Sequence, residues 1–223
     1  PTAGRHVVGP MVQLRWGSPT LLTLDLALLV ELPAPIRVIV LGRLQVLLPD
    51  QTHPLVQIRM DALGVLDLSA ETVSLDATLY DSRILQFTLT GDMALRAGWG
   101  NQPQFVLAIG GFHPRFAPPP GLPALKRLAL QLADGDSLQL RCQAYLAVTS
   151  NTVQFGARVD LHAAGGGFSF DGMLGFDAIL QLAPLAFAVD VGAALALRYH
   201  GRLLMGISFT GRLAGPTPWQ VEG

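Results

Sequence analysis

Apolar side chains alternate with polar ones through most of this chain. In residues 20–32, Leu22, Leu24 and Leu26 occupy every second position, and Asp25 lies between two of them. Successive side chains of a β-strand point to opposite faces of a sheet. The period of two therefore predicts strands that have one apolar and one polar face.

The same alternation recurs along the whole chain, separated by short connections rich in turn-forming residues. The runs cover approximately residues 20–32, 36–48, 55–68, 72–80, 84–97, 104–112, 127–132, 138–148, 153–163, 168–182, 185–197 and 203–213. Short connections favour antiparallel neighbours, because a parallel crossover needs a dozen residues or more. We therefore predict an all-β fold: an antiparallel meander of about 11–13 long amphipathic strands, strongly curved, forming a barrel-like body or a flattened sandwich.

Charged residues test this assignment of faces. In the register given by the alternation, the aspartates and arginines within the strands lie opposite the apolar set, as Arg43 lies opposite Val40 and Leu44. A slip of one residue would turn every side chain of a strand to the other face. One face is therefore expected to be apolar throughout.

Composition restricts the classes of partner. Half of the residues are hydrophobic, only 14% are charged, and the net charge is −1. This balance offers no electrostatic basis for binding nucleic acid. The single cysteine, Cys142, excludes an internal disulfide. No secretory signal and no apolar run of ~20 residues is visible, so the cytoplasm is the default compartment.

We expect residues 1–223 to form a single all-β domain. The chain opens at Pro1 without a methionine, which suggests a piece excised from a longer protein. A weak internal repeat has a period of about fifty residues, with Ile36, Ile84, Leu138 and Leu185 each beginning a strand–turn–strand unit.

Three fates are open to the apolar face. It can pack as the core of a flattened barrel or sandwich, line a groove for lipid-like ligands, or face a bilayer as a barrel. The bilayer is disfavoured, because membrane barrels carry aromatic girdles and this chain has only three tryptophans and three tyrosines. If a hydrophobic ligand is held, the candidate contacts on the apolar face and the long loop are Val38, Val40, Phe87, Leu89, Phe155, Phe170, Phe176, Phe187, Phe116, His113 and Arg115.

No arrangement of residues predicts catalysis. The five histidines are scattered and form no metal-binding pattern, and the serines lack the glycines of a hydrolase elbow. We therefore expect no catalytic residue, no metal and no cofactor, and a protein that is not an enzyme. An enzyme would require His113, Arg115 and an aspartate of the polar face to converge in one pocket.

Residues 110–128, with the sequence GGFHPRFAPPPGLPALKRL, form the one long interruption of the pattern. Its prolines prescribe a stiff path that cannot join a β-ladder. We expect a short helical turn near residues 122–126, followed by a strand. The segment is interpreted as a structural crossover or end cap, and the alternative is a lid or contact surface, since long loops are often functional.

Several stretches carry a resemblance to a known family. They are VVGPMVQLRWGSPTLLTLDL, LDATLYDSRI, LTGDMALR, GGFHPRFAPPPGLPAL, TSNTVQFGA, FSFDGMLGFDA and GPTPWQVEG. Together they resemble a region of very long bacterial proteins that forms a family of unknown function. The resemblance covers nearly the whole chain and implies a large, repetitive parent protein with no assigned activity. A looser pattern is similar to bridge-like lipid carriers, whose curved sheets are apolar inside.

Two functional hypotheses follow. The first is a non-catalytic module whose apolar face holds a lipid or other hydrophobic material. The second is a purely structural segment that associates with itself or with neighbouring segments of the same parent protein, and it predicts exposed strand edges at the two ends of the chain.

Overall fold

The computed structural model describes residues 6–33, 36–100 and 103–223. This part of the chain forms 17 β-strands and no helix, and every pairing described below is antiparallel. The all-β antiparallel prediction is confirmed. The chain divides into two compact units, Pro1–Leu107 and Ala108–Gly223. The boundary falls within β10 (Gln104–Ile109). Whether the two units act as a single domain stays a prediction.

The first unit is built around long strands joined by hairpins. Its strands are β1 (His6–Val8), β2 (Met11–Trp16), β3 (Leu22–Leu32), β4 (Arg37–Leu48), β5 (Val56–Asp67), β6 (Thr72–Leu79), β7 (Ser82–Ile84), β8 (Phe87–Thr90) and β9 (Asp92–Gly98). The ladder runs β2–β3–β4–β5–β6–β9, and β1 also pairs with β3. The short β7 pairs with both β5 and β8.

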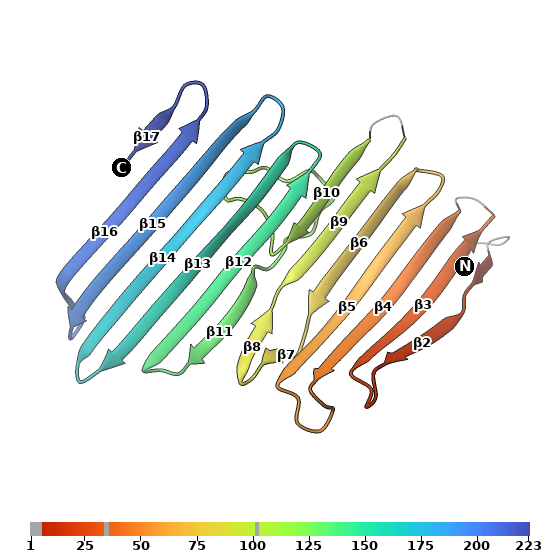
Figure 1. The fold of residues 1–223 in the computed structure, drawn as a ribbon, viewed down its shortest axis with the longest axis horizontal. Coiled ribbons are helices and arrows are strands. Elements are labelled where there is room, and N and C mark those ends of the chain that lie inside the picture. The colour runs from red at the N-terminus through yellow and green to blue at the C-terminus, as the bar shows by residue number, and fades with distance from the viewer. Residues whose placement is uncertain (1–5, 34–35, 101–102) are drawn as a thin grey trace. The chain divides into compact units, whose positions relative to one another are not determined.

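The second unit is a simple meander of hairpins (Figure 1). Its strands are β11 (Leu128–Asp134), β12 (Leu138–Thr149), β13 (Thr152–Gly165), β14 (Phe168–Gln181), β15 (Ala186–Tyr199), β16 (Arg202–Gly215) and β17 (Gln220–Glu222). Each strand pairs with the next along the chain. Strands β13 to β16 are 14 residues long.

The strand registers confirm the predicted separation of faces. In the first unit Asp25, Arg43 and Asp61 are aligned across β3, β4 and β5. In the second unit Asp160 and Met173 are aligned on one face. The next row, on the opposite face, aligns Cys142, Val159, Leu174, Ala193 and Phe209. Alternation in the sequence was sufficient to assign these faces.

The polar face of the first unit is less uniform than the alternation suggests. Met11, Ala27, Leu41 and Leu63 form an aligned apolar row on it, beside the row of Asp25 and its partners. This row lines a shallow hollow of about 760 Å³. Both faces of the first unit therefore carry apolar surface.

The strand count exceeds the predicted 11–13 mainly because of short strands. Strands β1, β7, β8 and β17 have only three or four residues each. The predicted run 84–97 is divided, since Leu85 takes a positive φ of 56° and turns the chain between β7 and β8. Ile84 therefore ends a strand, whereas the internal repeat requires it to begin one.

The expected helical turn near residues 122–126 is wrong. No regular structure forms there, and β11 begins at Leu128. The ring of Pro123 disfavours the helical conformation of Leu122, the residue before it. The described residues contain no helix long and apolar enough to span a membrane.

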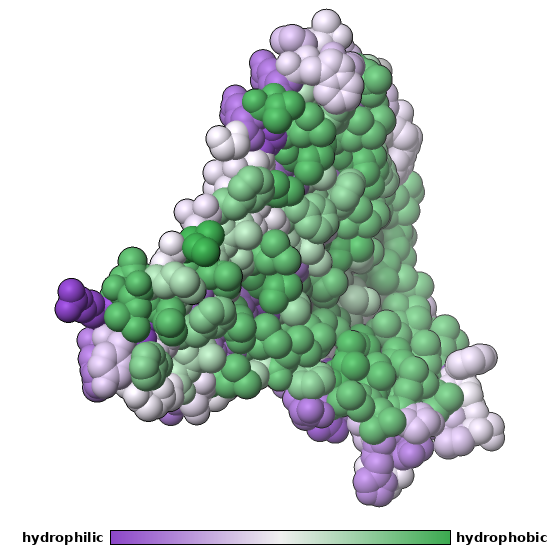
Figure 2. Space-filling view, turned by 60° about the vertical axis from the view of Figure 1, so that its left-hand side comes forward, coloured by the Kyte–Doolittle hydropathy of each residue, from purple (hydrophilic) through white to green (hydrophobic). Residues whose placement is uncertain are grey.

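The apolar face of the second unit is largely open. Leu174, Ile207 and Phe209 are 64%, 60% and 56% exposed. Figure 2 brings the β16 side forward and shows hydrophobic residues gathered over a broad surface. The buried side chains of this unit include Tyr145 and Ala147, which lie on the opposite, polar face. Burial in this unit is therefore concentrated under the long loop.

Candidate functional site

Residues 110–127 leave β10 and cross the polar face of the second unit, behind β12 to β14 in Figure 1. Gly110 begins this path with a φ of +70°, a conformation that favours glycine. A Cβ on Gly110 would lie 2.6 Å from the carbonyl oxygen of Ala144 on β12. Gly110 and the next residue, Gly111, which also has a positive φ, therefore allow the chain to turn in direct contact with the sheet.

His113 anchors the segment from inside. Its side chain is only 2% exposed, and its backbone N–H donates to Oε1 of the buried Gln154 at 3.0 Å. Gln154 donates in turn to the hydroxyl of Thr152. The imidazole Nδ1 accepts the backbone N–H of Arg115 at 3.2 Å. A nitrogen that accepts is unprotonated, so the neutral form has its proton on Nε2.

Arg115 and His113 both face Asp190 of β15. The Arg115 guanidinium donates to Oδ1 of Asp190 at 2.6 Å, and Nε2 of His113 lies 3.7 Å from Oδ2. Arg212 of β16 approaches the same carboxylate at 4.0 Å. The structure thus brings together His113, Arg115 and a polar-face aspartate. From the sequence this combination was only a requirement for an enzyme, and the sequence could not show that it forms.

Arg127 closes the other end of the segment. Its guanidinium donates to the carbonyl oxygens of Gly110 and Phe112 at 3.1 and 2.9 Å. The same group lies over the ring of Tyr145, 3.9 Å from its centroid, within the range of a cation–π contact. Phe112 and Phe116 stack at 5.5 Å. These contacts make the segment a cap held at both ends, which agrees with the favoured interpretation of a structural connection.

The side chain of Tyr145 on β12 crosses over Gly156 of β13 and reaches β14. Its hydroxyl donates to Oδ1 of Asp177 at 2.9 Å, although Gly156 of β13 lies between them in the register. A Cβ on Gly156 would lie 2.4 Å from the Tyr145 ring and 2.8 Å from Asp177. Gly156 is therefore required for this hydrogen bond. A glycine inside a strand often marks such a close approach.

Two carboxylates face each other in this region. Asp177 on β14 is the direct register partner of Asp190 on β15. Like charges placed opposite each other across a ladder are destabilising. Arg115 offsets the charge of Asp190, whereas Asp177 accepts only the neutral hydroxyl of Tyr145 among its described side-chain partners.

A hollow of about 570 Å³ lies beside these carboxylates. Its lining combines charged side chains with a nearly bare backbone, where Gly175 and Gly192 are register partners. Arg127, Arg158, Asp160, Asp177 and Asp190 supply the charge. The volume falls within the range of about 300–1,000 Å³ that is usual for ligand pockets.

Burial shifts the pKa values of two groups at the cap. Burial lowers the pKa of His113, against the weaker opposing influence of Asp177 and Asp190. Burial and the hydrogen bond to Asp177 raise the pKa of Tyr145 far above its ordinary value. Both shifts favour the neutral form of the side chain. The described residues include no group of three or more His, Cys, Asp or Glu side chains that could hold a metal ion.

The model of a family of unknown function matches residues 1–223. The chain belongs to this family, DUF6603. The resemblance to a family of unknown function is thus confirmed over the whole length. No curated protein and no solved structure matches the chain. Membership of DUF6603 assigns no activity, so the functional argument depends on the geometry of this chain.

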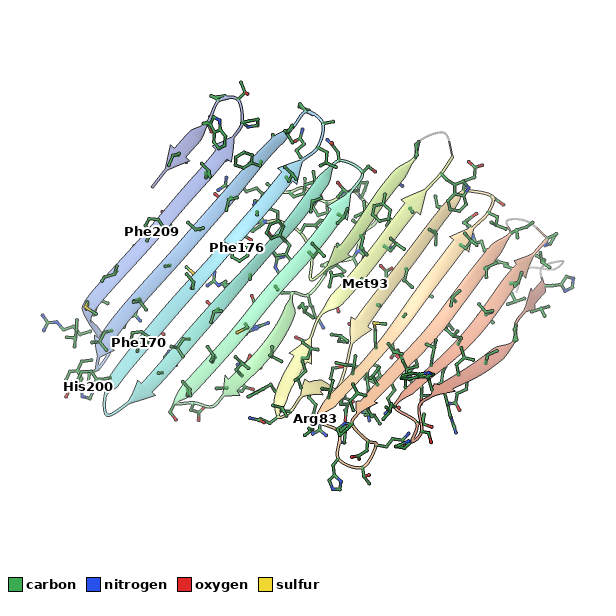
Figure 3. The ribbon with its side chains drawn as sticks, viewed as in Figure 1. Arg83, Met93, Phe170, Phe176, His200 and Phe209 are labelled. Atoms are coloured by element: carbon green, nitrogen blue, oxygen red, sulfur yellow. The ribbon has the colours of Figure 1, made fainter. Side chains whose placement is uncertain are left out.

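The predicted hydrophobic contacts of this DUF6603 chain fall into separate groups. In the second unit Phe155, Phe170, Phe176 and Phe187 share the apolar face, and Phe155 meets Phe176 edge-on at 6.2 Å. Figure 3 labels Phe170 and Phe176 on β14 and Phe209 on β16. Phe116 instead packs on Phe112 within the cap, where His113 and Arg115 also lie.

The remaining predicted contacts belong to the first unit. Val38 and Val40 lie on β4, half-buried, where they pair with Val30 and Leu28 of β3. Phe87 and Leu89 lie on the short β8, paired with Ile84 and Ser82. Strands β4 and β8 are not register partners, so strand pairing does not place Val38 and Val40 beside Phe87 and Leu89.

The sequence does not single out four residues of the site in this DUF6603 chain: Arg127, Tyr145, Gly156 and Asp177. In the sequence, Asp177 resembles the other aspartates of the polar face, and Arg127 resembles an ordinary charged residue of a loop. Gly156 was the available signal, because it interrupts a strand inside the distinctive stretch TSNTVQFGA.

Proposed function

We propose that this chain is a non-catalytic module whose apolar sheet face binds long-chain lipids or similar hydrophobic material. The observation that supports the proposal is the open apolar face of the second unit. Exposed apolar patches on soluble monomers seldom exceed a few hundred Å², and larger ones mark interaction surfaces. Here large side chains on β14 and β16 are more than half exposed, among them Leu174, Ile207 and Phe209.

The energetics of this face favour an acyl ligand. Removal of apolar surface from water is worth roughly 25 cal/mol per Å². A flexible hydrocarbon chain can lie along the row of Leu174 and Phe209 and pair its surface with theirs. Within β13 to β16 the registers place the polar and charged side chains on the other face, except for Tyr199 and Arg202 beside the turn that joins β15 to β16.

Native mass spectrometry of the purified chain, with organic extraction of what it carries, tests the proposal. We expect co-purified lipid, or uptake of added oleic acid, and we expect Phe209→Lys to reduce uptake at least tenfold. Ser208→Lys is the matched control, because Ser208 is the neighbouring residue and points to the polar face. Equal uptake by the two variants, or no uptake by the unaltered chain, would refute the proposal.

A second candidate function is structural, and a separate observation favours it. Within the second unit, β17 pairs with β16 only over Arg212–Ala214, so the outer edge of β16 from Arg202 to Gly211 has no described partner in that unit. Within the first unit, the described partner of β2 is β3. Open edges of this length are templates for pairing with another strand.

Sedimentation velocity over a hundredfold range of concentration tests the structural candidate. We expect association that increases with concentration and that weakens in Ser208→Lys, because a lysine on an edge strand opposes pairing. This variant leaves the apolar face unchanged, so it separates edge pairing from lipid binding. A monomer at every concentration would count against the structural candidate and leave the lipid proposal unaffected.

A further inference from the structure

We infer that the polar face of the second unit carries a binding site for a neutral saccharide, in the hollow beside Asp177. The site lies on the face opposite to the proposed lipid surface and does not depend on that proposal. Its floor is formed by β13, β14 and β15, and Pro114 and Arg127 of the cap contribute to its rim.

Two glycines leave the centre of the floor bare, and at one of them, Gly192, no packing contact requires a glycine. Gly175 and Gly192 are paired across β14 and β15. A Cβ added to Gly192 would meet only the Met173 methyl group, at an ordinary contact distance of 3.8 Å. Glycine in a strand interior is destabilising relative to alanine. A bare floor next to a cavity instead suits a flat ligand that approaches the backbone closely.

The charges of the lining select the ligand class. Arg127, Arg158, Asp160 and Asp177 all line the hollow; Arg158 is paired with Asp160, and Asp190 is paired with Arg115. An anionic ligand would meet Asp177, and a cationic ligand would meet the two arginines. A hydroxyl group both donates and accepts, so neighbouring hydroxyls can donate to a carboxylate and accept from a guanidinium. A saccharide presents such hydroxyls without net charge.

Asp177 is the group best placed to accept from the ligand. Its Oδ1 holds the Tyr145 hydroxyl, and no described side chain donates to its Oδ2. The residue lines the hollow and opposes Asp190 at a cost in electrostatic energy. The Tyr145 bond, which Gly156 makes room for, fixes the orientation of the carboxylate in advance.

The hollow continues along the sheet, which sets the size of the ligand. A second hollow of about 930 Å³ adjoins it and shares Gln143, Arg158, Asp160 and Met173 in its lining. Along β15 the floor continues through Ala194 and Ala196, both small. At the far end His162 and Arg198 both hold Asp171. The trough has room for a chain of several sugar rings.

A glycan array that includes neutral, sialylated and sulfated glycans tests the inference with the intact chain. We expect binding to at least one neutral glycan, and a loss of at least tenfold in Asp177→Asn and in Gly192→Leu. Gly165→Leu is the matched control, because a Cβ on Gly165 meets nothing within 4 Å and the residue does not line the hollow. This control should bind like the unaltered chain.

Three results would overturn the inference: no neutral glycan bound, binding restricted to charged glycans, or binding that survives Gly192→Leu. Circular dichroism and thermal unfolding of each variant establish that it is folded. Phe209→Lys on the apolar face should leave glycan binding unchanged, so failure of the lipid proposal and failure of the saccharide site are distinguishable.

Discussion

The hydroxyl of Tyr145 donates to Asp177 across an intervening strand, with 2.9 Å between Oη and Oδ1. The bond joins β12 to β14 over the bare backbone of Gly156. It fixes a carboxylate that no described guanidinium pairs with, beneath a cap that holds His113 and Arg115 against Asp190. The arrangement of side chains on this polar face therefore depends on Gly156, on the Tyr145 hydroxyl and on the proline-rich cap.

Gly156 and Gly192 make a matched pair of substitutions. Gly156→Ala places a methyl group 2.4 Å from the Tyr145 ring and should lower the free energy of unfolding by about 1–3 kcal/mol, the usual range for overpacking. The methyl group added by Gly192→Ala has free space, so this substitution should raise the free energy of unfolding by roughly 0.5–1 kcal/mol. Urea unfolding of both variants measures the difference. Similar effects at the two positions would mean that Tyr145 does not cross Gly156.

Removal of the Tyr145 hydroxyl tests the bond itself. Tyr145→Phe leaves a carboxylate without its donor and should lower the free energy of unfolding near pH 7 by about 1–3 kcal/mol. The raised pKa of Tyr145 means that its contribution is present below the ordinary tyrosine value of 10.0 and is lost as the pH rises above it. The difference between the two proteins should therefore shrink above pH 10, and a difference that grows there would contradict the assignment.

Burial of His113 predicts a stability that falls in mild acid. Its pKa is lowered in the folded state, so below 6.5 the unfolded chain binds a proton that the folded chain does not. The free energy of unfolding should decrease as the pH falls from 6.5 toward the folded pKa. His113→Asn keeps an acceptor for the Arg115 N–H and should flatten this decrease, whereas His53→Asn, in an exposed turn, should not. If the free energy of unfolding falls with pH to the same extent in the unaltered chain, His113→Asn and His53→Asn, the prediction is wrong.

Arg115 is expected to hold the cap closed. Arg115→Ala removes the 2.6 Å contact with Asp190 and should accelerate hydrogen exchange of the backbone N–H groups of His113, Arg115 and Phe116 by up to about fivefold, since a half-exposed ion pair contributes about 1 kcal/mol or less. Arg202→Ala is the control, because Arg202 has no ion pair with the described residues. Unchanged exchange in Arg115→Ala would show that His113 and Arg127 hold the segment without it.

The fold was largely predictable because its physical cause is local. Alternation within each strand determines which side chains share a face, and hairpins join neighbours, so the strand bounds from β12 to β16 agree with the predicted runs within about two residues. The divided region around Leu85 was not predictable in this way, since a leucine with positive φ leaves no mark on the alternation.

The candidate site was much less predictable, because it forms by long-range pairing. His113 and Arg115 were recognisable as unusual loop residues, but Asp190 lies far from them in the chain and resembles the other polar-face aspartates. The register alone brings Asp177 opposite Asp190. The opposition of two carboxylates is a property of strand pairing, which the sequence of either strand does not contain.

Paramagnetic broadening of methyl NMR signals by a doxyl-labelled stearic acid tests most directly the claim that one face of the sheet binds hydrophobic material. Met173 and Leu174 are consecutive residues of β14 that face opposite sides. We predict strong broadening of the methyl signals of Leu174 and Ile207, and little effect on those of Met173 and Ala194. Equal broadening on both faces, or none on Leu174 and Ile207, would contradict the account.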